Sequence, residues 1–264
     1  MLSYQHAYHA GSLADVHKHA LLSVMLARLA EKDKPLSYLE THAGRGLYAL
    51  DGAEAHKTGE AAQGILSVEK RGWFGPSHPY AQMLARVRTT HGAMAYPGSP
   101  LIAGQLLRPD DRIIVAELHP QEYAALIEAM LPYPVAARKT DGVQMALALT
   151  PPEPRRGLLL IDPSFEVKDD YASLPRLIAQ VHRKWNVGII ALWYPMLADM
   201  RHRPMLAELD AAAFPKALRH EVRFPPARDG HGMAGSGMFI VNTPYGLTDE
   251  AQRLSGLFAG LSDR

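Results

Sequence analysis

One short stretch near the middle of the chain carries residue types that suit a particular reaction. The apolar run Leu158–Ile161 ends in Asp162, Pro163, Ser164 and Phe165. An adenine amine is a poor nucleophile, because its lone pair is delocalised into the ring. If Asp162 and the backbone carbonyl of Pro163 both accept its hydrogens, the nitrogen moves towards tetrahedral geometry, while Phe165 offers a flat face to an extruded base. The stretch therefore predicts an amine-activating site.

Three other predicted strand ends carry residues that could bind a nucleoside. The turn at residues 41–46 contains Gly-x-Gly, which lets backbone approach a ligand closely. Glu117 could hold both ribose hydroxyls, or simply precede the helix that Pro120 begins. Asp141 could accept a hydrogen bond from an adenine amine, or cap the next helix. Their places at successive carboxyl ends of strands favour one shared pocket.

Strands and helices that alternate along the chain must position these residues. Apolar runs predict five strands, at residues 36–40, 112–118, 135–140, 158–162 and 187–193, and two more at 217–224 and 237–242. Apolar spacing predicts helices between them. The alternation is typical of a parallel sheet covered on both faces. The loop at 225–236 is too short for a crossover helix, so the last two strands should pair antiparallel.

This layout resembles the Rossmann-like α/β fold of class I S-adenosylmethionine-dependent methyltransferases. In such sheets ligands bind beyond the carboxyl ends of the strands. Residues 48–96 interrupt the pattern, because they are rich in Gly, Ala and His and show two helices, at 59–70 and 78–90, but no strand. We interpret 48–96 as a small helical insertion, and residues 1–47 and 97–264 as the methyltransferase domain.

Composition excludes several other classes of protein. The 264 residues include no cysteine, which excludes disulfides, iron–sulfur clusters and thiolate zinc sites. The segment after Met1 has no apolar core of a signal peptide, and the longest apolar runs are too short to span a membrane. We therefore expect a cytoplasmic protein that does not bind membranes. The net charge of +1 does not by itself indicate a nucleic-acid partner.

Longer motifs identify a family. Asp162–Phe165 resembles the Asp/Asn-Pro-Pro-Tyr/Phe tetrad of amino-methylating enzymes, with Ser164 at the usual second proline. The N-terminal stretches 1–11 and 15–19 look like those of the bacterial large-subunit (23S) rRNA adenine-N6 methyltransferases. Further motifs of that family recur at 41–44, 96–100, 117–120, 141–142 and 191–195. The resemblance covers the whole chain, and it implies a monomer that methylates adenine in 23S rRNA before the subunit is assembled.

The resemblance also implies roles for individual residues. It places seven residues around S-adenosylmethionine: His19, His42, Ser99, Glu117, Asp141, Gly142 and Asp162. Asp162 would also act at the amine, and Tyr4 would contact the RNA. For the RNA phosphates we expect a contact face made of the N-terminal segment with Lys18, the turn with Arg45 and the helical insertion. No metal is expected.

Three alternatives differ in chemistry. A metal-dependent hydrolase could use the histidines before Gly44, but His17 and His19 are two positions apart on a helix and should face apart. A non-catalytic RNA-binding relative is favoured only by Ser164. A methyltransferase with another acceptor, such as DNA adenine or a protein glutamine amide, would use the same residue types.

Overall fold

The computed structural model describes residues 6–167, 169–225 and 232–261. Its centre is a seven-stranded sheet in the order β5-β4-β1-β6-β7-β9-β8. The strands are β1 (Ser37–Glu40), β4 (Arg112–Ala116), β5 (Val135–Arg138), β6 (Gly157–Ile161), β7 (Ile189–Leu197), β8 (Leu218–Arg223) and β9 (Met233–Val241). Five strands run parallel, and β9 pairs antiparallel with both β7 and β8. The predicted fold class and final hairpin are confirmed.

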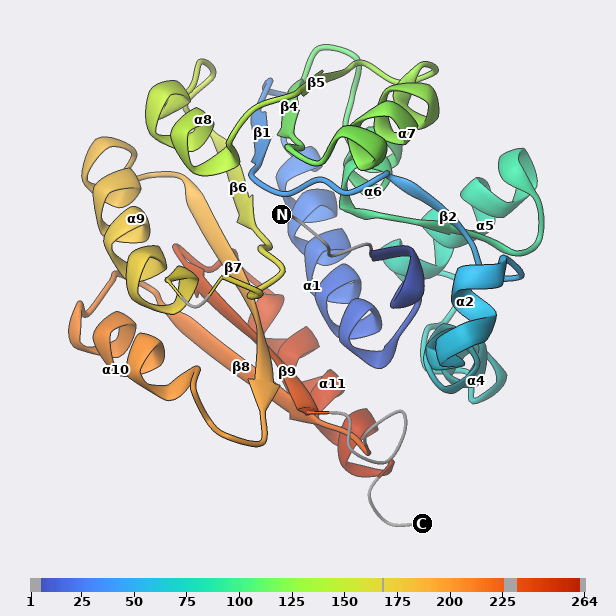
Figure 1. Ribbon diagram of the computed structural model, residues 1–264. Coiled ribbons are helices and arrows are strands. Elements are labelled where there is room, and N and C mark those ends of the chain that lie inside the picture. The colour runs from blue at the N-terminus through green and yellow to red at the C-terminus, as the bar shows by residue number, and fades with distance from the viewer. Residues whose placement is uncertain (1–5, 168, 226–231, 262–264) are drawn as a thin grey trace.

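Helices cover both faces of this sheet. One group is α8 (Gly142–Leu149), α9 (Asp170–Lys184) and α10 (Arg203–Ala211), on the left of Figure 1. The other group contains η1 (His6–Tyr8), α1 (Leu13–Ala30), α6 (Ser99–Leu106), α7 (Pro120–Met130) and α11 (Leu247–Ala259). Successive residues of a strand point to opposite faces, so Tyr38 packs into the core under α1 and Leu39 into the core under α9. Among the residues that the structure describes, no helix combines the length and the hydrophobicity that a membrane span requires.

The segment at 48–96 differs from the expectation in two ways. Its ends form a two-stranded antiparallel ribbon, β2 (Leu47–Ala49) with β3 (Ala95–Pro97), where no strand was expected. Three-residue strands are too short to show a period of two in the sequence. The helix expected at 59–70 is divided by Gly64, whose missing Cβ would lie 2.0 Å from the carbonyl oxygen of Gly11.

The segment contains three short helices and a fourth of 13 residues. They are α2 (Ala53–Thr58), α3 (Glu60–Gln63), α4 (Ile65–Lys70) and α5 (Pro79–His91). Tyr80, Met83 and Val87 of α5 are buried in the same apolar core as α1. The segment therefore shares its core with the rest of the chain, and its treatment as a separate insertion stays a prediction.

Candidate active site

Acidic side chains follow the carboxyl ends of four neighbouring strands. Glu40 ends β1, and Glu117, Asp141 and Asp162 follow β4, β5 and β6 within one to three residues. Because these four strands are parallel and adjacent, their carboxyl ends lie on one edge of the sheet. The structure therefore brings the predicted acids to a common edge, as the sequence pattern indicated.

Asp162 is held by a buried lysine from the first long helix. Its Oδ2 accepts a hydrogen bond from Lys18 Nζ at 2.6 Å, and the same ammonium lies 3.1 Å from Asp15 Oδ1. The ammonium also lies 5.4 Å from the ring centre of Trp193. Burial acts to lower the pKa of Lys18, but the two carboxylates outweigh it and raise that pKa. Lys18 therefore remains charged in the interior.

This arrangement corrects the expectation that Lys18 contacts RNA phosphates. Lys18 is only 4% exposed, and two carboxylates already neutralise its charge. A sequence cannot show this pairing, because Lys18 and Asp162 are 144 positions apart. The ion pair assigns Lys18 to the orientation of Asp162 rather than to the surface of the protein.

Asp15 is a site residue that the sequence did not reveal. It accepts hydrogen bonds from the backbone N–H of Gly11 at 3.0 Å and pairs with His6 Nε2 at 2.9 Å. Burial alone would raise the pKa of Asp15, but its interaction with His6 and the charge of the Lys18 ammonium bring it well below its usual value. The carboxylate thus anchors both the lysine and the segment before α1. In a sequence, an acid in the first turn of a helix is expected to stabilise the helix N-terminus, so the sequence does not show that Asp15 binds Lys18.

Glu40 is the second residue that the sequence analysis missed. Its carboxyl is fully buried and accepts hydrogen bonds from the Ser99 and Tyr38 hydroxyls, the latter at 2.9 Å. Burial raises the pKa of Glu40 to about 8, although both hydrogen bonds oppose the rise. Glu40 is therefore largely neutral at pH 7. The available signal was an acid in the short strand Ser37–Glu40, all of whose residues are buried.

The buried acid Glu40 should make stability fall as pH rises. Its pKa is higher in the folded state than in the unfolded chain, so the folded protein binds the proton more tightly and loses that advantage between pH 4.5 and about 8. Glu40→Gln keeps an acceptor but no titrating proton. Between pH 5 and 9, the unfolding free energy of the variant relative to that of the wild type should rise by a few kcal/mol, as measured by urea unfolding. Equal pH slopes for wild type, Glu40→Gln and the exposed control Glu128→Gln would contradict this.

The loop after Asp162 has a strained backbone and a covered aromatic ring. Phe165 has a φ of 56°, in the left-handed region that non-glycine residues rarely adopt. Its ring is 7% exposed and packs 4.8 Å from the ring of Tyr171 and 6.1 Å from that of Trp193, between ring centres. Strain of this kind clusters at functional loops. The open stacking face expected of Phe165 is not presented in this conformation.

Glu117 and the glycine turn form one unit. The Glu117 carboxylate accepts the backbone N–H of Gly44 at 2.8 Å and that of His119 at 2.7 Å. Burial raises the pKa of Glu117, while these two bonds oppose the rise. A carboxylate has about four acceptor positions, so these hydrogen bonds do not use all of them. The structure thus holds the Glu117 carboxylate in a fixed position at the carboxyl end of β4.

Asp141 and Gly142 have structural roles that the sequence left open. Asp141 Oδ1 accepts the backbone N–H of Gln144 at 2.9 Å and caps α8. A Cβ on Gly142 would lie 1.8 Å from the carbonyl oxygen of Thr41, so only glycine allows the start of α8 to approach the turn after β1. The same contact places Asp141 beside His42, whose pKa burial lowers.

Two predicted cofactor residues lie beneath this edge rather than on it. His19 is 1% exposed and bonds to the Tyr96 hydroxyl at 2.9 Å, and burial lowers its pKa to about 3. Ser99 is 4% exposed and donates to Glu40. Both side chains support the residues of the site. Tyr4, the predicted RNA contact, lies outside the described residues.

The histidines before Gly44 do not converge. His17 Nδ1 bonds to Ser236 and His17 Nε2 to His220, at 2.8 and 2.9 Å, whereas His19 faces Tyr96. The prediction that His17 and His19 face apart is confirmed. Within the described part of the chain, no three His, Asp or Glu side chains are arranged to hold a metal ion.

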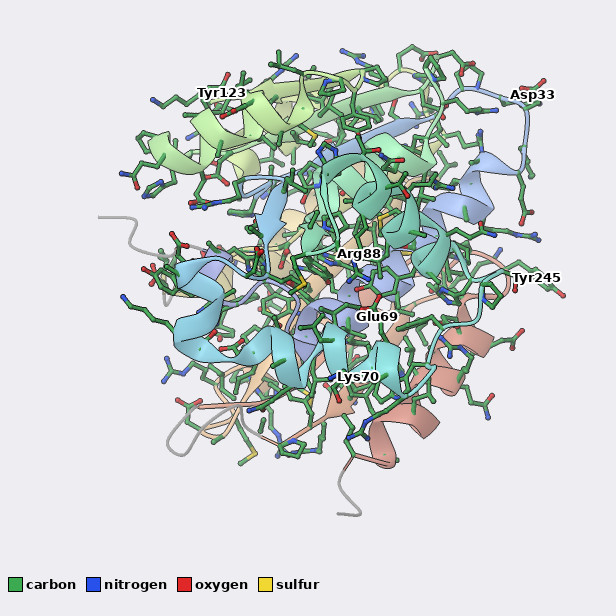
Figure 2. The ribbon with its side chains drawn as sticks, turned by 90° about the vertical axis from the view of Figure 1, so that its right-hand side faces the viewer. Asp33, Glu69, Lys70, Arg88, Tyr123 and Tyr245 are labelled. Atoms are coloured by element: carbon green, nitrogen blue, oxygen red, sulfur yellow. The ribbon has the colours of Figure 1, made fainter. Side chains whose placement is uncertain are left out.

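Much of the basic surface expected to contact RNA is already paired. Arg45 forms a two-pronged pair with Glu122, at 3.1 and 2.6 Å. Arg88 of α5 donates two hydrogen bonds to Glu69 of α4, one of them 3.0 Å long. Figure 2 shows these two residues beside each other. Lys70 is exposed on α4. The helical segment thus offers fewer free cations than its sequence suggests.

Comparison with known proteins agrees with this architecture. The family model described as "Ribosomal RNA large subunit methyltransferase D, RlmJ" matches residues 33–260. The chain is 40% identical over 256 residues to ribosomal RNA large subunit methyltransferase J of Escherichia coli (strain K12), covering 95% of this chain and 90% of that protein. It is 37% identical over 261 residues to the protein of the same name in Haemophilus influenzae, covering 96% and 92%.

A solved structure matches over the same extent. The crystal structure of protein LPL1258 from Legionella pneumophila has a TM-score of 0.85 and 34% identity, and the match covers 96% of this chain and 94% of that one. The match in structure and the matches in sequence each extend over nearly the whole of this chain. The chain therefore belongs to the ribosomal RNA large subunit methyltransferase family RlmJ.

Proposed function

We propose that this protein transfers a methyl group from S-adenosylmethionine to N6 of an adenine in 23S rRNA, acting on rRNA that is not yet assembled into the subunit. One observation carries the proposal. Asp162, followed by Pro163, stands at the carboxyl end of the central strand β6 with one oxygen bonded to Lys18. None of the described residues donates a hydrogen bond to its other oxygen, Oδ1. The relatives named above carry the substrate class, large-subunit rRNA, in their names.

The reaction needs an amine with an available lone pair. Oδ1 of Asp162 and the carbonyl oxygen of Pro163 are the acceptors that would draw the two amine hydrogens out of the base plane. Lys18 fixes the Asp162 carboxylate through a second, buried bond, so Oδ1 does not need to be reoriented when the base enters. An ion-paired carboxylate is a strong hydrogen-bond acceptor, and we assign Asp162 the role of accepting a hydrogen bond from the amine.

The residues on the acidic edge fit the methyl donor. Glu117 would hold the ribose hydroxyls with its remaining acceptor capacity, and Asp141 would accept from the adenine amine with Oδ2, since Oδ1 caps α8. His42 lies at the same turn. When bound, S-adenosylmethionine supplies an electrophilic methyl group on a sulfonium.

Loss of the Glu117 side chain should weaken cofactor binding. Glu117→Ala removes the ribose acceptors, and we expect a loss of about 1–3 kcal/mol in binding free energy, the range for hydrogen bonds to a charged group. Calorimetry with S-adenosylmethionine measures this directly, with Glu128→Ala, at an exposed position of α7, as the control. Wild-type affinity in Glu117→Ala, with an unchanged melting temperature, would remove Glu117 from the cofactor site.

Nucleoside analysis of rRNA tests the proposed function in cells. We expect 23S rRNA from cells without the gene to lack one N6-methyladenosine, and the wild-type gene to restore it. The Asp162→Ala gene should fail to restore it at equal protein level. An unchanged content of N6-methyladenosine in the deletion strain would contradict the proposal.

A further inference from the structure

A cleft lies beyond the active-site edge, between α10 and the ends of β7 and β8. Its volume is about 460 Å³, within the range of sites that hold small ligands. Met196 and Leu206 line its floor and are nearly buried. Figure 1 shows α10 next to α9, below the loop that follows β6. The mechanism above uses none of the residues that line this cleft.

The rim of the cleft has an excess of positive charge. Arg203, Arg219 and Arg223 line it together with the carboxylates of Asp210 and Glu221. Arg219 pairs with Asp210, and Glu221 accepts the Tyr194 hydroxyl at 2.8 Å. Arg203 and Arg223 are exposed, and neither forms a hydrogen bond or ion pair with the residues that the structure describes. Two unpaired guanidinium groups above an apolar floor suit a ligand with a flat ring and a phosphate.

The strand β7 connects this cleft to the amine-activating site. Trp193 lies against Phe165 and near the Lys18 ammonium, which binds Asp162. Met196 is three residues further along the same strand, roughly 10 Å away at the rise of a β-strand. A chain of nucleotides whose target base is held at Asp162 can therefore reach the cleft with a neighbouring nucleotide.

We propose that this cleft binds a nucleotide that flanks the target adenine in the substrate RNA. Its base would pack on Met196 and Leu206, and its phosphate would bind Arg203 and Arg223. The inference rests on the proposed function, because it needs an RNA whose target base enters at Asp162. It goes further, because it assigns a second RNA contact on a surface separate from the helical segment at 48–96.

Charge reversal on the rim tests the proposal. The probe is an unmodified 23S rRNA transcript, and the measurement is its dissociation constant between 50 and 200 mM salt. We expect Arg203→Glu/Arg223→Glu to bind the transcript about tenfold or more weakly, with a salt slope smaller by about two. The affinity for S-adenosylmethionine should stay unchanged. The matched control is Arg176→Glu/Arg183→Glu, which changes net charge equally on the exposed face of α9 and should stay within about twofold of wild type.

Photo-crosslinking identifies the occupant. A photoreactive amino acid at Met200, an exposed residue of the cleft, should crosslink to a nucleotide next to the methylated adenine. Equal RNA affinity in wild type and the rim variant would overturn the inference, as would equal weakening in the control. Crosslinks only to RNA remote from the target, or binding of free AMP at the cleft without any loss of RNA affinity in the rim variant, would also overturn it. If the wild type binds the transcript but never methylates it, the proposed function fails while the affinity test still decides whether the cleft binds RNA.

Discussion

Asp162→Ala should lower the single-turnover rate of methyl transfer to 23S rRNA by about a hundred- to a thousandfold, the range for losing one preorganised hydrogen-bonding group at a reacting centre. The variant removes Oδ1, the acceptor that would orient the amine, while the Pro163 carbonyl remains. RNA affinity should change little, because the carboxylate contributes orientation rather than a phosphate contact. Rapid mixing of excess enzyme with labelled S-adenosylmethionine and transcript measures the rate.

Asp162→Asn is the matched variant for this prediction. Its amide oxygen still accepts a hydrogen bond, so it should retain more activity than Asp162→Ala. It loses the charge that pairs with Lys18. If both variants are equally slow, the negative charge of Asp162 contributes more to the rate than its ability to accept a hydrogen bond. Asp162 would then act by taking a proton from the amine. Full activity in Asp162→Ala would end its catalytic assignment.

The Lys18→Met variant should be much less stable than the wild type. Lys18 is buried between Asp15 and Asp162, so its removal leaves two carboxylates close together without a counter-charge. Breaking a buried pair in this way costs about 3–5 kcal/mol of unfolding free energy. We expect the loss in urea unfolding at pH 7, and we expect it to shrink as pH falls and the carboxylates are protonated.

The exposed Lys32 provides the control for this variant. Lys32→Met removes the same charge from the exposed turn after α1, and its unfolding free energy should stay within about 0.5 kcal/mol of wild type. Equal stability of Lys18→Met and wild type would show that the buried pair contributes nothing. In that case the assignment of Lys18 to orienting Asp162 would lose its physical basis.

The sheet and its functional edge could be predicted because their signals are local. A strand buried on both faces, such as Gly157–Ile161, is a continuous apolar run, and the acid after it ends the strand. The carboxyl ends of adjacent parallel strands must then meet. Asp162 and Glu117 were therefore located from the sequence, and the structure places both at the expected edge.

The errors concern contacts between distant parts of the chain. Lys18 was expected to contact RNA, because the local sequence does not show that it pairs with Asp162, which is 144 positions away. Gly64 divides a helix because the carbonyl of Gly11 approaches it, which no local pattern shows. Glu40 stands in a strand whose other residues are buried, and only the hydroxyls of Ser99 and Tyr38 explain how an acid is accommodated there. Packing over long sequence distances determines each of these features.

The most direct test of the account is a reaction with three purified components: this protein, S-adenosylmethionine carrying an isotopically labelled methyl group, and an unmodified 23S rRNA transcript. Mass spectrometry of the digested RNA identifies the labelled nucleoside. We predict N6-methyladenosine at one position, formed by the wild type and nearly absent with Asp162→Ala. Label on another nucleoside or another atom of adenine, or no transfer by folded wild-type protein that binds the cofactor, would contradict the account.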